Sequence, residues 1–191
     1  LTAALLSTFL DAPLIRFLAL LCSVAGATCF AVGWLWPGLI LLLIAGPLAS
    51  VARRITRIRL QTGMRYERLA LAGWFVDQLA IVLLAAWLAS HGGGWGCPVL
   101  AIIIITATVA AEVENRLYGR LTGVAIEEGA PADRLVALLG SSRDGMLLLL
   151  VPFAALKLWV PGLAAMALYA GGSFFVRQAR FAFALDRWRG A

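Results

Sequence analysis

Long apolar stretches separated by short polar ones dominate this chain and predict six membrane-spanning segments. An α-helix needs roughly 20 residues to cross the hydrocarbon core of a bilayer. The strands of a membrane barrel would alternate apolar and polar positions, and these stretches do not. Because lipid offers the backbone no hydrogen-bond partner, we expect an all-α bundle of six transmembrane helices. The predicted spans are residues 14–35, 39–51, 69–90, 99–111, 146–160 and 163–188.

The segments outside these spans complete the predicted organisation. Residues 1–10 are apolar but lack the basic start of a secretory signal, so residues 1–12 are interpreted as an interfacial helix. The bundle itself covers residues 14–188, and residues 1–191 are expected to form a single integral membrane domain. Since the chain begins at Leu1 rather than Met, we expect an excised domain or a processed product.

Composition supports a lipid environment. Hydrophobic residues make up 62% of the 191 residues, against roughly 45–50% in soluble domains. A soluble fold could not bury that much apolar surface, so membrane lipids are the expected surroundings. The formal net charge of +6 then indicates arginines beside anionic lipid and no nucleic-acid partner. A homodimer is among the expected assemblies.

Basic residues alternate along the chain between connections that carry them and connections that lack them. Residues 34–38 contain no lysine or arginine, and residues 91–98 contain only a histidine. Short cytoplasmic loops retain lysine and arginine, whereas translocated loops lose them. The pattern therefore predicts a multi-pass protein of the bacterial inner membrane with both termini in the cytoplasm. The arginines that carry the pattern are Arg53, Arg54, Arg57, Arg59, Arg65, Arg68, then Arg116, Arg120, Arg134, Arg143, and finally Arg177, Arg180, Arg187, Arg189.

Asp77 is a carboxylate inside the third predicted span, roughly 12 Å from a helix start at residue 69. An ionisable group within a membrane is costly and is by default a functional-site hypothesis. Its predicted helical face also holds Tyr66, Ala70, Gly73 and Ala80, and this face should point inward. Two roles stay open for Asp77: a functional site, or a structural group that bonds a neighbouring helix or an arginine.

Arg177 and Arg180 lie at helical spacing on the last span, near its inner boundary. Guanidinium groups on one face suit bidentate binding of phosphate. The alternative is that they only extend to the headgroups and anchor the topology. Glu112 and Glu114 are interpreted as a solvated, salt-bridged surface, and no nucleotide-binding loop or zinc motif is present.

The order of the predicted parts carries a further signal. Six helices are combined with an arginine-rich inner connection after the second helix and with a basic last helix. Residues 46–71 align with the pattern D-x2-D-G-x2-A-R-x8-G-x3-D-x3-D, with Arg54 and Gly63 matched and Glu67 at the third aspartate position. A shifted register that pairs Ala52 with Arg53 needs one extra residue before Gly63. In layout and motif the chain resembles the CDP-alcohol phosphotransferase family, as a divergent member with an eroded motif.

This resemblance implies a transferase that moves a substituted phosphate group from a CDP-linked donor to an alcohol, in phospholipid metabolism. In the family, four aspartates hold divalent Mg or Mn against the diphosphate. Here Gly46, Ala49 and Leu71 replace three of them, so Glu67 is the only metal-ligand candidate that the motif offers. One carboxylate cannot hold a hard cation that needs several oxygen ligands. We therefore expect the usual chemistry to be lost or altered.

Three hypotheses follow from these residues. The first is a phosphotransferase-like protein that binds a phosphate-bearing lipid or nucleotide on the cytoplasmic side without turnover. The second is an active, metal-dependent transferase with Glu67 and Asp77 as catalytic residues. The third is a small scaffold or transporter in which Asp77 is a coupling or packing group. The arginines assigned to phosphate in the first hypothesis are Arg53, Arg54, Arg177 and Arg180.

Overall fold

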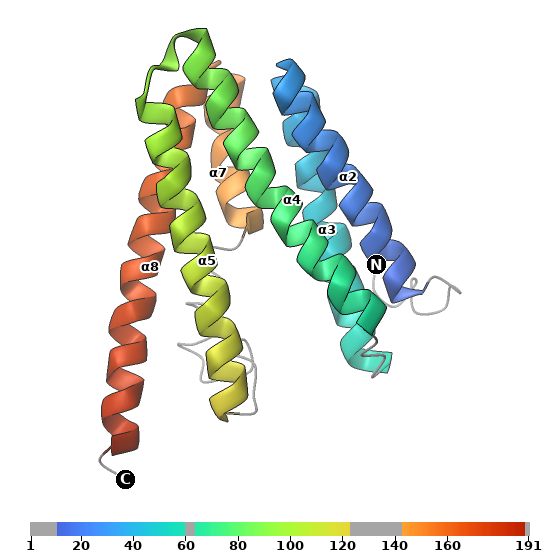
Figure 1. Ribbon diagram of the computed structural model, residues 1–191, viewed down its shortest axis with the longest axis vertical. Helices are drawn as coiled ribbons and strands as arrows, with labels where there is room; N and C mark the ends of the chain where they lie inside the picture. The colour runs from blue at the N-terminus through green and yellow to red at the C-terminus, as the bar shows by residue number, and fades with distance from the viewer. Residues whose placement is uncertain (1–10, 60–63, 123–142, 190–191) are drawn as a thin grey trace. The chain divides into compact units, whose positions relative to one another are not determined.

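The computed structural model describes residues 11–59, 64–122 and 143–189, and this part of the chain is all-α (Figure 1). No strand occurs among these residues. The predicted interfacial helix falls almost entirely on residues 1–10, outside the described part. The helices are α2 (Ala12–Val32), α3 (Leu35–Arg59), α4 (Met64–Leu88), α5 (Gly96–Thr122), α7 (Arg143–Ala155) and α8 (Trp159–Arg189), with a short π-helix η1 (Ala89–Gly93) after α4.

Five of these helices are long and apolar enough to cross a membrane, which indicates an integral multi-pass protein. Their apolar spans are Ala12–Val32, Leu35–Thr56, Tyr66–Gly93, Gly96–Glu114 and Trp159–Ala179. The sixth, α7, is apolar but has only 13 residues. At about 1.5 Å per residue, it is shorter than the hydrocarbon core is thick.

Contacts divide the chain into two compact units, Leu1–Gly92 and Gly93–Ala191. In the first unit, α2 packs against both α3 and α4. The helix α2 ends at Gly33, whose φ of 89° is left-handed, and Trp34 N–H donates to Cys29 O. Because α3 already begins at Leu35, the chain turns at residues 33–34 rather than over the predicted residues 34–38. Pro37 then lies in the first turn of α3, where its missing N–H costs nothing.

The close contact between α2 and α3 depends on two glycines. A Cβ at Gly38 would lie 2.6 Å from the Phe30 ring, and one at Gly26 would lie 2.9 Å from Leu42. Each would also lie 3.0 Å from the backbone oxygen of the other glycine. Glycine lets the two helix backbones come into close van der Waals contact. Such packing matters in lipid, because the hydrophobic effect does not drive helices together there.

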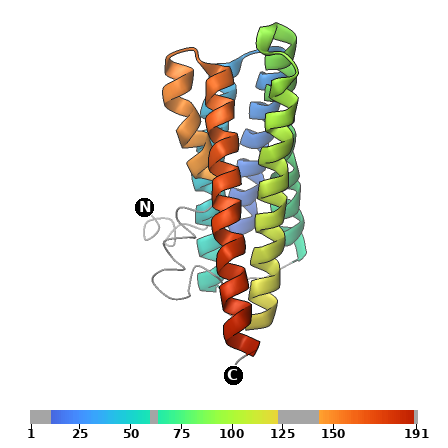
Figure 2. The same cartoon turned by 90° about the vertical axis from the view of Figure 1, so that its left-hand side faces the viewer.

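In the second unit, α8 contacts both α5 and α7, and Figure 2 shows it between them. The turn from α7 to α8 centres on Lys157, which has a positive φ of 58°. Its N–H donates to Ala154 O and that of Leu158 donates to Phe153 O. The fifth span therefore ends at Ala155 instead of residue 160, and α8 begins four residues before the predicted start.

Candidate functional site

The arginines at one end of the first unit sit on a firmly packed part of α3. Ala52 and Ile55 are fully buried against Ala12 and Ile15 of α2. Arg53 and Arg54, between the two buried α3 residues, are both exposed. A helix that is fixed by its buried side holds these two positions at the boundary of the apolar span.

The two predicted catalytic carboxylates, Glu67 and Asp77, are separated along α4. Glu67 lies in the first turn of the helix and is exposed, whereas Asp77 is half-buried with its Oδ1 atom inaccessible to solvent. Ten residues of helix correspond to about 15 Å. They therefore cannot ligate one ion together, and no group of three or more His, Cys, Asp or Glu residues that could hold a metal occurs in the described part. These residues do not fit the divalent site that the resemblance implies.

Arg16 of α2 is a buried charge that our sequence analysis did not single out. It is only 9% exposed, and its Nη2 donates to Ala70 O of α4 at 3.1 Å. A Cβ at Gly73 would lie 3.2 Å from that Nη2 atom. The prediction that the face with Asp77 points inward is confirmed for Gly73 and Ala80, which are both buried. A single arginine within an apolar stretch was the signal that could have identified this contact.

The second unit contains a polar cluster between α5 and α8. Gln178 Nε2 donates to Glu114 Oε1, and Arg177 interacts electrostatically with Glu114. Both charged side chains are half-buried, and the Nε atom of Arg177 is inaccessible to solvent. The interpretation of Glu114 as solvated surface is therefore wrong, because the carboxylate faces a neighbouring helix.

The remaining predicted site residues are only partly described. Arg180 lies on α8, but its side chain is outside the described part, as is Gly63 altogether. Arg53 and Arg54 belong to the first unit and Arg177 and Arg180 to the second, so the predicted phosphate-binding arginines form two sets. Arg53 and Arg54 are exposed, whereas Arg177 is half-buried beside Glu114, so the first pair is more accessible to solvent.

Comparison of the chain with protein-family models and with curated proteins found no match, so its resemblance to CDP-alcohol phosphotransferases stays a prediction.

Proposed function

We propose that this chain is a phosphotransferase-like protein of the bacterial inner membrane that binds a phosphate-bearing lipid or nucleotide without metal-dependent turnover. Both termini lie in the cytoplasm in this proposal, as do Arg53 and Arg54. The distribution of arginines along the sequence supports that orientation.

The single observation that carries the proposal is the exposure of Arg53 and Arg54 beside the buried anchors Ala52 and Ile55. A guanidinium presents several N–H donors in a planar fork that matches phosphate oxygens. Two such groups on an anchored helix lose less conformational freedom on binding than two on a loop would. The second set, Arg177 and Arg180, contributes less, because Glu114 competes with a ligand for Arg177.

The loss of metal-dependent transfer is supported by the positions of the carboxylates. A divalent ion in the family chemistry neutralises charge on the diphosphate leaving group. Glu67 and Asp77 lie too far apart on α4 to share one ion, and the other motif positions carry no carboxylate. Binding by arginine needs no metal and is therefore expected to survive where transfer does not.

Replacing Arg53 and Arg54 together by alanine is expected to weaken binding of CDP-diacylglycerol by about a hundredfold, because each of the two charge-assisted hydrogen bonds contributes at least roughly 1.5 kcal/mol. The measurement is a titration of the full chain in detergent, monitored by intrinsic fluorescence. Binding by the unaltered chain should be the same in magnesium and in excess EDTA, with no CMP released.

Lys157→Ala is the matched control, since it removes one exposed positive charge at the α7–α8 turn of the second unit. It should bind as tightly as the unaltered chain. Magnesium-dependent CMP release that Glu67→Ala abolishes would reject the proposal and restore an active transferase.

A second candidate function, a scaffold or transporter that uses Asp77, is favoured by the buried contact between α2 and α4. Asp77 lies one helical turn beyond Gly73, on the face where Arg16 contacts Ala70. A carboxylate there adds negative charge near a buried guanidinium, which suits a packing role.

Asp77→Asn is expected to lower the free energy of unfolding by about 1 kcal/mol, because it removes a charge near Arg16 but keeps similar shape and polarity. Thermal unfolding in detergent, followed by circular dichroism, measures this effect. Leu79→Met, at a 51% exposed position of the same helix, serves as the comparison and should not reproduce the loss. An ion flux into vesicles that disappears in Asp77→Asn, without loss of stability, would instead assign Asp77 a coupling role.

A further inference from the structure

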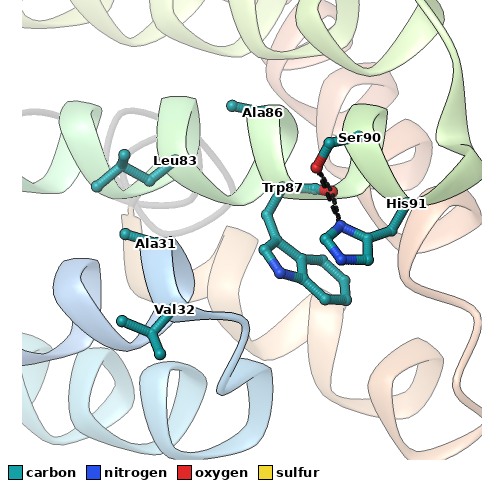
Figure 3. Close-up of a pocket in the computed structure, with 7 residues that line it drawn as sticks. All are labelled: Ala31, Val32, Leu83, Ala86, Trp87, Ser90 and His91. Atoms are coloured by element: carbon teal, nitrogen blue, oxygen red, sulfur yellow. Dashed lines mark hydrogen bonds between the residues drawn. The ribbon is translucent and has the colours of Figure 1, made fainter.

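A groove of about 500 Å³ lies in the first unit where α2 and α4 end (Figure 3). Val32 and Leu83 contribute to its apolar wall, and Trp87, Ser90 and His91 form a polar edge. Figure 3 shows Leu83 toward one end of the groove and Ser90 with His91 toward the other, with Trp87 between them. The groove is at the opposite end of the first unit from Arg53 and Arg54, so it is distinct from the site proposed above.

The groove lies at the level where two apolar spans end. Val32 is the last residue of the span in α2, and the span in α4 continues only to Gly93. Leu83 lies ten residues before the end of the α4 span, whereas Ser90 and His91 lie within its last four residues, so the polar edge is nearer the end of the span than Leu83 is. Indole and imidazole rings suit this boundary, because one part of each is apolar and another forms hydrogen bonds.

Hydrogen bonds fix the orientation of the His91 ring. Its Nδ1 atom lies 2.9 Å from Trp87 O and 3.0 Å from Ser90 Oγ, and Ser90 Oγ itself donates to Trp87 O. A carbonyl oxygen only accepts, so the contact with Trp87 O places a proton on Nδ1. The second nitrogen, Nε2, hydrogen-bonds to none of the described residues.

The Trp87 ring supports that orientation. Its plane is stacked on the imidazole, with centroids 4.0 Å apart and an interplanar angle of 16°. The indole edge is held in turn over Gly33, where a Cβ would lie 2.5 Å from Nε1. His91 can reach back over the indole because the backbone leaves helical geometry at His91 and Gly92. The chain therefore presents Nε2 from a constrained ring.

We infer that this groove binds one phospholipid, with an acyl chain along Val32 and Leu83 and the headgroup phosphate at Nε2 of His91. An anionic oxygen selects the ring that carries protons on both nitrogens, since only that ring donates from Nε2 while Nδ1 donates to Trp87 O. A volume of about 500 Å³ falls within the roughly 300–1,000 Å³ of ligand pockets. The position of the groove at the ends of two apolar spans favours a lipid over a soluble molecule.

The test uses the full chain in phosphatidylcholine vesicles that contain phosphatidylglycerol with a photoreactive group in one acyl chain. After illumination, mass spectrometry compares labelling at Val32 and Leu83 with labelling at Leu168, an α8 residue that is 78% exposed. Lipid of the surrounding bilayer would label the groove residues and Leu168 to a similar extent, whereas a lipid bound in the groove would raise the labelling of Val32 and Leu83. We expect about tenfold enrichment, the ratio that roughly 1.4 kcal/mol of preference gives.

His91→Ala is expected to remove most of this enrichment, and Ala86→Trp, which fills the groove, should abolish it. Trp95→Ala, which alters a 91% exposed aromatic residue outside the groove, is the matched control and should keep it. His91 is exposed, so its variant decides the result even if Ala86→Trp fails to fold. Equal labelling of the groove and Leu168, or enrichment that survives His91→Ala, would each overturn the inference.

Discussion

Gly38→Ala is expected to lower the free energy of unfolding by about 2 kcal/mol, within the roughly 1–3 kcal/mol that overpacking costs. The new methyl group would lie 2.6 Å from Cδ1 and 2.7 Å from Cε1 of Phe30. Phe30 is only 1% exposed, so its ring has little room to move. The methyl would also lie 3.0 Å from Gly26 O, and a backbone atom can yield only if the whole helix shifts.

Gly172→Ala is the matched control, because it makes the same substitution within a helix where nothing lies within 4 Å of the new Cβ. Alanine exceeds glycine in helix propensity by roughly 1 kcal/mol, so this variant should be unchanged or more stable. Thermal unfolding of both variants in the same detergent gives the comparison. Equal effects of the two substitutions would show that the α2–α3 contact does not require glycine.

The helices themselves could be predicted from sequence, because their cause is local. Continuous apolar stretches and the need to satisfy every backbone group predict spanning helices, and the structure confirms an all-α chain. Their ends were harder to place. Pro37 and Pro161 fall between the predicted spans, yet each lies in the first turn of a helix. The turns instead occur at Gly33 and Lys157, where φ is positive.

Contacts between helices were predicted less well, because they depend on which faces meet. The inward face was confirmed only for Gly73 and Ala80, and its partner, Arg16, lies more than 50 residues earlier in the chain. Glu114 was interpreted from the sequence as solvated surface, although its side chain contacts Gln178 of α8. The helix bounds in the structure explain why Glu114 and Arg177 meet. Glu114 and Arg177 are each the nineteenth residue of helices that run in the same direction, so they lie at the same depth.

Because Glu114 and Arg177 lie at the same depth, we expect this pair to stabilise the contact between α5 and α8. Glu114→Ala is expected to lower the free energy of unfolding by about 2 kcal/mol, less than the roughly 3–5 kcal/mol of a fully buried pair because both groups are half-buried. The cost arises because Arg177 stays between the helices without the carboxylate beside it, and Gln178 loses its acceptor. Glu114→Gln keeps an acceptor for Gln178 and should cost less.

A double-mutant cycle separates this interaction from a general loss of packing. If the cost of Glu114→Ala comes from the remaining guanidinium, Arg177→Leu in the same chain should recover about 1 kcal/mol, a coupling within the range of roughly 0.5–3 kcal/mol seen for residues in contact. Lys157→Ala, which removes an exposed charge from the same unit, should change stability by less than about 0.5 kcal/mol. Thermal unfolding of the four chains of the cycle measures the coupling. Strictly additive effects of Glu114→Ala and Arg177→Leu would mean that the two charges do not stabilise the α5–α8 contact, and Arg177 would then be available to an anionic ligand.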